Sequence, residues 1–183
     1  MNRATRTLFL TLGVLAGVMG IEHGIGEVLQ GYGPTDGVYI QSWPHSPFFE
    51  IMSGEPAMSV VPNYLLTGVL SILSSCALLV VLVKSNHERR AMILLFVLLV
   101  VMLLTGAGFG PPVVGLIAAS IALKKNSPLK AWSGFPAGFH GVLSALWPWS
   151  FAICVIAWLM LFPGTAIVAF TTGSHDPLLM IVP

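Results

Sequence analysis

The sequence predicts an all-α membrane protein, a bundle of about five transmembrane helices that includes a tight helical hairpin. The first reason is composition: of 183 residues, 56% are hydrophobic and 8% are charged, with a mean hydropathy of +0.90. Soluble domains are roughly a quarter charged, so the solvent for this chain is a lipid bilayer. A net charge of +1 without a basic face excludes nucleic acid as a partner.

The second reason is the length of the uncharged runs. A bilayer core of about 30 Å needs about 20 apolar residues in a helix. Residues 7–29 fit a first span with polar groups in its last third, and we interpret it as an uncleaved signal-anchor. Residues 62–83 fit a second span, in which Pro62 occupies the first turn, where proline is tolerated.

A helical hairpin follows. The 33 residues from 91 to 123 carry no charge, yet as one helix they would be about 50 Å long, too long for one crossing. The stretch GAGFGPP interrupts them, which predicts two short helices over residues 91–107 and 111–123. The tip of this hairpin contains Gly106, Gly108, Gly110, Pro111 and Pro112.

The last span is expected over residues 137–162, with a kink near Pro148 because proline removes a backbone donor. A polar tail, residues 163–183, follows it, and a long outer loop, residues 32–61, joins the first two spans. We expect residues 1–183 to form a single transmembrane domain.

The third reason is the distribution of basic residues, which favour cytoplasmic loops. In the five-span arrangement all of them fall on one side: Arg3, Arg6, Lys84, Arg89, Arg90, Lys124, Lys125 and Lys130. This predicts a cytoplasmic N-terminus and an extracytoplasmic C-terminus. The acidic residues of the outer loop and the tail then lie outside.

The end of the first span, GIEHGIGEVLQG, combines small and titratable residues. At about 100° per residue the small residues form one stripe, which is expected to pack closely against another helix. The stripe consists of Gly13, Gly17, Gly20 and Gly24. Glu27 continues it, and His23 lies four residues away, within reach of a shared hydrogen bond or ligand. Glu22 projects from the opposite face and is predicted to be an interfacial carboxylate.

The outer loop contains no Lys or Arg and several aromatic residues, and a short interfacial helix over residues 47–52 is expected to cover the bundle. Carboxylate and imidazole groups on this side are candidates for ligands or a proton relay: His23, Glu27, His45, Glu50 and Glu55. A divalent transition metal is a possible cofactor, with His23 and Glu27 as its first ligands. The alternative is a polar pair that closes the bundle, since no HExxH motif is present.

Three hypotheses about function remain open. The first is a small membrane subunit or scaffold component that uses its glycine stripe to form a homo-oligomer or join a larger complex. The second is a membrane-embedded metal-dependent or redox enzyme, although no catalytic constellation is recognised. The third is a small transporter or proton pathway through Glu27 and the hairpin tip.

The stretches GIEHGIGEVLQG, GEPAM and GFGPP resemble small prokaryotic multi-span membrane proteins without an assigned activity, over about residues 6–125. The resemblance implies no activity. We expect the protein in a prokaryotic cell inner membrane. The first span alone is similar to DoxX-type small membrane proteins, through a glycine-punctuated helix that begins after arginine and ends in a polar group. The long outer loop and the fifth span depart from that pattern, so no functional residue is transferred.

Overall fold

The computed structural model describes residues 3–44, 54–84, 89–123 and 134–160, with residues 167 and 171. The chain divides into two compact units, residues 1–126 and 127–183. Within the described residues it is mostly helical, with five helices and two short strands. Three helices are long and apolar enough to cross a membrane, which confirms the prediction of a helical protein with membrane spans.

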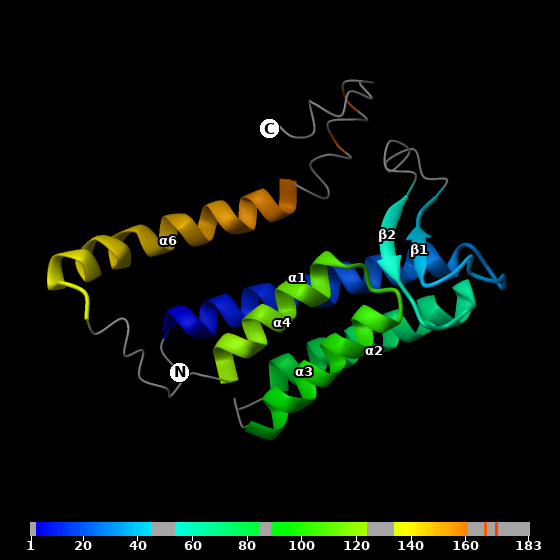
Figure 1. The fold of residues 1–183 in the computed structure, drawn as a ribbon, viewed down its shortest axis with the longest axis horizontal. Coiled ribbons are helices and arrows are strands. Elements are labelled where there is room, and N and C mark those ends of the chain that lie inside the picture. The colour runs from blue at the N-terminus through cyan, green and yellow to red at the C-terminus, as the bar shows by residue number, and fades with distance from the viewer. Residues whose placement is uncertain are drawn as a thin grey trace. The chain divides into compact units, whose positions relative to one another are not determined.

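The first unit is built on two long helices, α1 (Arg3–Val28) and α2 (Tyr64–Lys84), which run side by side (Figure 1). They touch at Gly24 and Gly68, where a Cβ atom on Gly24 would lie 2.8 Å from the Gly68 carbonyl oxygen. Ser71 on α2 also donates a hydrogen bond of 2.9 Å to the Gly20 carbonyl oxygen. The glycine stripe of the first span is therefore packed against α2 of the same chain.

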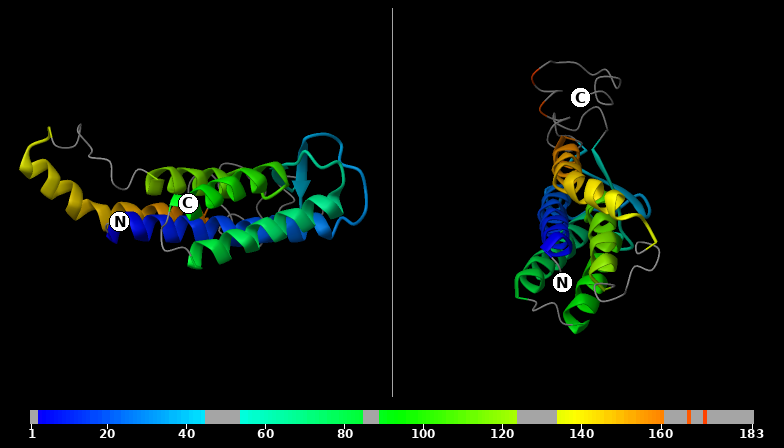
Figure 2. Two further views of the ribbon diagram at one scale, coloured as in Figure 1. Left: turned by 90° about the horizontal axis from the view of Figure 1, so that it is seen from below. Right: turned by 90° about the vertical axis from the view of Figure 1, so that its left-hand side faces the viewer.

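The interruption predicted at GAGFGPP separates α3 (Arg89–Leu104) from α4 (Gly110–Leu123). These two helices pack against each other, α3 packs on α2 and α4 packs on α1, so that the first unit is a four-helix bundle (Figure 2). Gly106 and Gly108 in the turn have φ angles of 91° and 74°, which lie in the left-handed region that favours glycine.

The interior of this bundle changes character along its length. The buried core includes Phe9, Leu12, Leu82, Met92 and Leu95, toward the ends that carry the basic residues. Toward the opposite end, α2 instead buries a row of hydroxyl groups, on Thr67, Ser71, Ser74 and Ser75. Polar side chains are thus concentrated in the half of the bundle that contains His23 and Glu27.

The expectation of an all-α fold was wrong for the outer loop. It contains β1 (Tyr39–Ser42) and β2 (Glu55–Met58), which pair antiparallel with Ser42 opposite Glu55. Each strand has only four residues, too few for a periodicity that the sequence could reveal, and their pairing joins segments separated by more than ten residues. The short helix expected over residues 47–52 lies outside the described residues.

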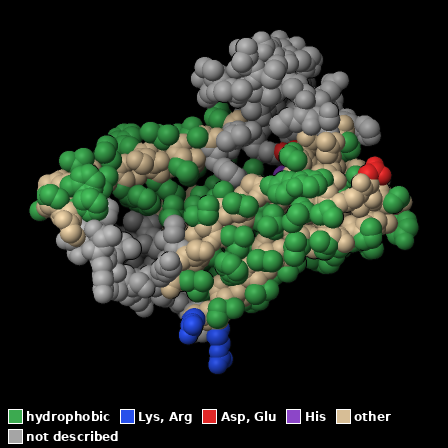
Figure 3. All heavy atoms as spheres, viewed as in Figure 1, with side chains coloured by type: hydrophobic (Ala, Val, Ile, Leu, Met, Phe, Trp, Pro, Cys, Tyr) green, Lys and Arg blue, Asp and Glu red, His purple; other side chains and the backbone are tan. Residues whose placement is uncertain are grey.

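The second unit contains α6 (Ala137–Leu159), which includes Pro148. Its large apolar side chains are exposed around the helix, and none of its most apolar stretch is buried. On the first unit, too, apolar side chains cover the outside of the helices (Figure 3). Apolar surface on this scale is typical of contact with lipid.

Candidate metal centre

His23 on α1 is buried, at 4% exposure, and its two ring nitrogens have different surroundings. Nδ1 lies 3.0 Å from the backbone oxygen of Met19, one turn earlier. A carbonyl oxygen can only accept a hydrogen bond, so Nδ1 carries the proton. In a neutral imidazole, Nε2 then presents its lone pair, as a metal ligand does.

Glu55 on β2 faces this nitrogen. Its Oε2 atom lies 3.3 Å from His23 Nε2, and the side chain is 4% exposed. Among the residues that the structure describes, none forms a hydrogen bond with this buried oxygen. An ionised carboxylate and a neutral Nε2 are both acceptors, so a stable contact needs a proton or a metal cation between them.

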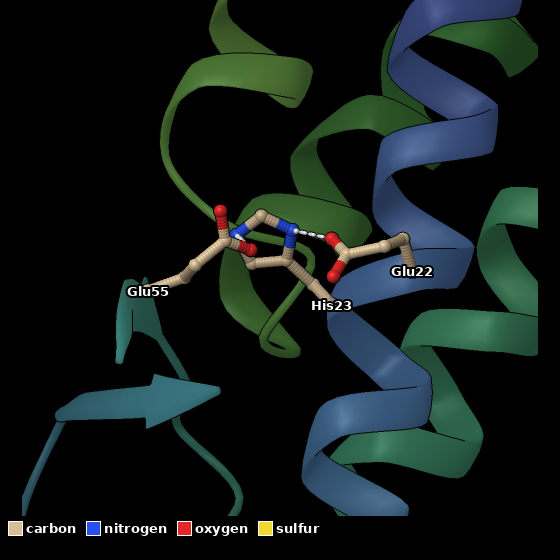
Figure 4. A group of neighbouring side chains, drawn as sticks. All are labelled: Glu22, His23 and Glu55. Carbon is tan, nitrogen blue, oxygen red and sulfur yellow. Dashed lines mark ion pairs between the residues drawn. The ribbon is translucent and has the colours of Figure 1, made fainter. Parts of the chain in front are cut away.

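Glu22 completes the group, which Figure 4 shows converging from α1 and β2. Its Oε2 atom lies 3.2 Å from His23 Nδ1, and its side chain is 29% exposed. One ligand atom from each of Glu22, His23 and Glu55 falls within 4.8 Å of the others. The helical wheel places Glu22 on the face opposite Glu27, and in the structure its carboxylate lies beside His23.

Glu27 lies in a different position. Its side chain is fully buried, and its Oε1 atom accepts a hydrogen bond of 3.1 Å from Ser42 Oγ on β1. It does not belong to the group formed by Glu22, His23 and Glu55. The other two candidates from the sequence, His45 and Glu50, lie outside the described residues.

The tip of the α3–α4 hairpin packs against both α1 residues. A Cβ atom on Gly108 would lie 2.5 Å from His23 Nε2, and one on Gly106 would lie 2.6 Å from the carboxyl carbon of Glu27. The EHGIGE stretch and the GAGFG stretch are therefore in direct contact. Gly110, Pro111 and Pro112 form the first turn of α4, where Pro112 is fully buried.

The sequence missed two members of this region, Glu22 and Ser42. Glu22 is adjacent to His23 in the sequence, and this adjacency could have indicated their contact. The position of Glu22 on the opposite face of the helix suggested otherwise. Ser42 gave no signal, because its contact with Glu27 depends on how the strands dock against α1.

The electrostatic state of Glu55 follows from its surroundings. Burial, as the largest cause, and the neighbouring Glu22 carboxylate together raise the pKa of Glu55 to about 9. At neutral pH, Glu55 in the metal-free protein therefore holds a proton, which a metal cation would replace.

This shift predicts a pH dependence for the metal-free protein. The folded state keeps the Glu55 proton up to about pH 9, whereas the unfolded chain, with the ordinary pKa of 4.5, has already released it. Between these values the folded state binds more protons, so its stability falls as the pH rises. We expect the Tm in detergent with a chelator to decrease from pH 5 to pH 9, with a shallower slope in Glu55→Gln. Equal slopes in the two proteins would contradict this assignment.

Comparison of the chain with protein-family models, with curated proteins and with solved structures finds no match.

Proposed function

We propose that this chain is a five-crossing protein of a prokaryotic inner membrane that binds a divalent transition metal between His23 and Glu55, with Glu22 beside them, on its extracytoplasmic side. It acts as a metal-binding subunit or scaffold component. The observation that carries the proposal is the facing pair of His23 Nε2 and Glu55 Oε2, 3.3 Å apart in a buried setting.

The separation of this pair suits a shared ion. Two ligands that each lie about 2.0–2.1 Å from a tetrahedral metal are about 3.3 Å apart. The Met19 carbonyl holds the proton on Nδ1, as the outer partner of a metal-bound histidine commonly does. An imidazole with carboxylates suits Zn²⁺, Fe²⁺ or Mn²⁺, whereas thiolate-preferring ions find no cysteine among these groups.

The balance of charge supports a cation as the ligand. Glu22, Glu27 and Glu55 gather near one end of the bundle. The basic side chains among the described residues belong to the opposite helix ends, and Figure 3 places blue and red groups at separate ends of the visible face. Among the described residues, no Lys or Arg lies beside these carboxylates, and buried carboxylates are costly as anions, so they recruit protons or a metal ion.

The separation of basic from acidic side chains also supports the predicted orientation of the protein in the membrane. Lys84 ends α2 and Arg89 and Arg90 begin α3, at the end of the bundle that the positive-inside rule assigns to the cytoplasm. His23, Glu27 and the β-hairpin then lie toward the extracytoplasmic face. Five crossings follow if α3 and α4 each span the membrane as a hairpin.

The interior of the bundle supports a role in metal binding rather than in transport. The row of buried hydroxyl groups on α2 ends at Ser75, and the next buried residues on this face are Leu78 and Leu82. Among the described residues, the core beyond this point is apolar, which offers a cation no polar path to the cytoplasm. The metal would enter and leave on one side.

Metal analysis of the purified protein tests the proposal. After gentle extraction and loading with Zn²⁺, Fe²⁺ or Mn²⁺, we expect about one ion per chain by mass spectrometry, since His23 Nε2 and Glu55 Oε2 face each other across a single site. His23→Ala should lose the ion, whereas the control His140→Ala, on α6, should keep it. A wild-type protein that retains none of the three ions would overturn the proposal.

A further inference from the structure

We infer that Glu27 is a positioning residue: it holds the β1–β2 hairpin on α1, through Ser42, so that Glu55 reaches His23. This role differs from that of a ligand, which the sequence had suggested for Glu27. The inference rests on the proposed metal site for its functional consequence, but the docking of the hairpin can be measured without metal.

Three consecutive residues at the end of β1 contact the C-terminal end of α1 and the turn that follows it. Gln30 Nε2 donates a hydrogen bond of 2.9 Å to the Gln41 backbone oxygen, and Ser42 Oγ donates one of 3.1 Å to Glu27 Oε1. The ring of Trp43 covers Gly26, where a Cβ atom would lie 2.6 Å from Trp43 Cδ1. Of these contacts, the one at Ser42 joins two side chains that are both completely buried.

The register of the two strands places Glu55 of the metal site next to this contact. Ser42 pairs with Glu55 across the two strands, and both side chains are buried on the inward face. Directly opposite residues in an antiparallel pair lie only about 4.5–5.5 Å apart. Fixing Ser42 on Glu27 therefore fixes Glu55 near His23, which precedes Glu27 by one helical turn.

The hairpin is also attached at its far end. The backbone of Gly106 donates a hydrogen bond of 2.8 Å to the Met58 oxygen, and Ser59 pairs with Thr105. These bonds hold the end of β2 on the α3–α4 turn, three or more residues beyond Glu55. At the Glu55 end, the hydrogen bond between Ser42 and Glu27 joins a buried side chain of the hairpin to a buried side chain of α1.

Substitutions separate positioning from ligation. Ser42→Ala and Glu27→Ala remove the hydrogen bond, while Glu27→Gln retains an oxygen that accepts it. For Zn²⁺ titrated calorimetrically into the metal-free full-length protein, we expect Ser42→Ala and Glu27→Ala to weaken binding about 3- to 10-fold, the equivalent of one hydrogen bond. Glu27→Gln should bind close to wild type, whereas Glu55→Gln should lose binding. Ser144→Ala, on α6, is the matched control for loss of a serine hydroxyl.

Hydrogen exchange of the metal-free variants provides the independent readout. We expect faster exchange in Ser42→Ala at β1 and β2, with α2 and α3 unchanged, and recovery of slow exchange in Glu27→Gln. If Glu27→Gln loses Zn²⁺ as completely as Glu55→Gln, Glu27 is a ligand and the inference is overturned. Unchanged exchange in Ser42→Ala would also overturn it. If wild type binds no Zn²⁺ while the exchange pattern holds, the metal proposal fails and the positioning contact stands.

Discussion

Alanine at Gly24 or Gly68 is expected to destabilise the bundle by about 1–3 kcal/mol or more, as overpacking of a close contact does. A Cβ atom on Gly68 would lie 2.6 Å from the Gly24 carbonyl oxygen and 2.7 Å from the Val28 nitrogen. These neighbours are backbone atoms, so no side chain can rotate away and the two helices must separate. Thermal unfolding in mild detergent measures the effect as a lower Tm.

The matched control is Gly141→Ala. Gly141 lies within α6 and has no atom near the position of an added Cβ, so alanine there should be neutral or slightly stabilising. The same experiment tests whether the stripe serves the fold of one chain: Gly24→Ala should lower the Tm without a change in oligomeric state. A change of oligomeric state with an unaltered Tm would count against this interpretation.

Gly108→Ala is expected to abolish metal binding at His23, a loss greater than the about 100-fold that removal of an outer partner of a metal ligand causes. The added methyl would lie 2.5 Å from Nε2, the nitrogen that faces Glu55, and 2.8 Å from Cε1. The imidazole would have to rotate away from Glu55. Calorimetry with Zn²⁺ and metal analysis both report this loss.

Backbone strain alone must be separated from this contact, because Gly108 has a φ angle of 74°. Gly31→Ala provides the control: its φ angle is 77°, and no atom lies within 4 Å of the added Cβ. Both variants carry the same conformational penalty of about 1–2 kcal/mol, but Gly31→Ala should bind Zn²⁺ normally. Equal losses in the two variants would show that strain, not the contact with His23, determines binding.

The helices and their approximate ends could be predicted from the sequence. Long uncharged runs must form hydrogen-bonded helices in lipid, and this local requirement does not depend on the rest of the fold. The length of the uncharged run required a break, the glycines and prolines of GAGFGPP located it, and α3 and α4 begin and end near the predicted residues. His23 and Glu27 attracted attention for the same local reason: titratable groups are costly next to an apolar run.

The partners of those residues were decided by the tertiary structure. Glu55 reaches His23 because a two-stranded hairpin folds over the end of α1, and strands of four residues leave no periodic trace in a sequence. Glu22 belongs to the group because its long side chain brings its carboxylate to within 3.2 Å of His23 Nδ1, which its position on the helix did not indicate. Whether Gly106 and Gly108 form a plain turn or a close cover for Glu27 and His23 depended on contacts between segments about eighty residues apart. Hydropathy and charge act along the chain and can be read from it, whereas a site built from three segments exists only once their packing brings the side chains together.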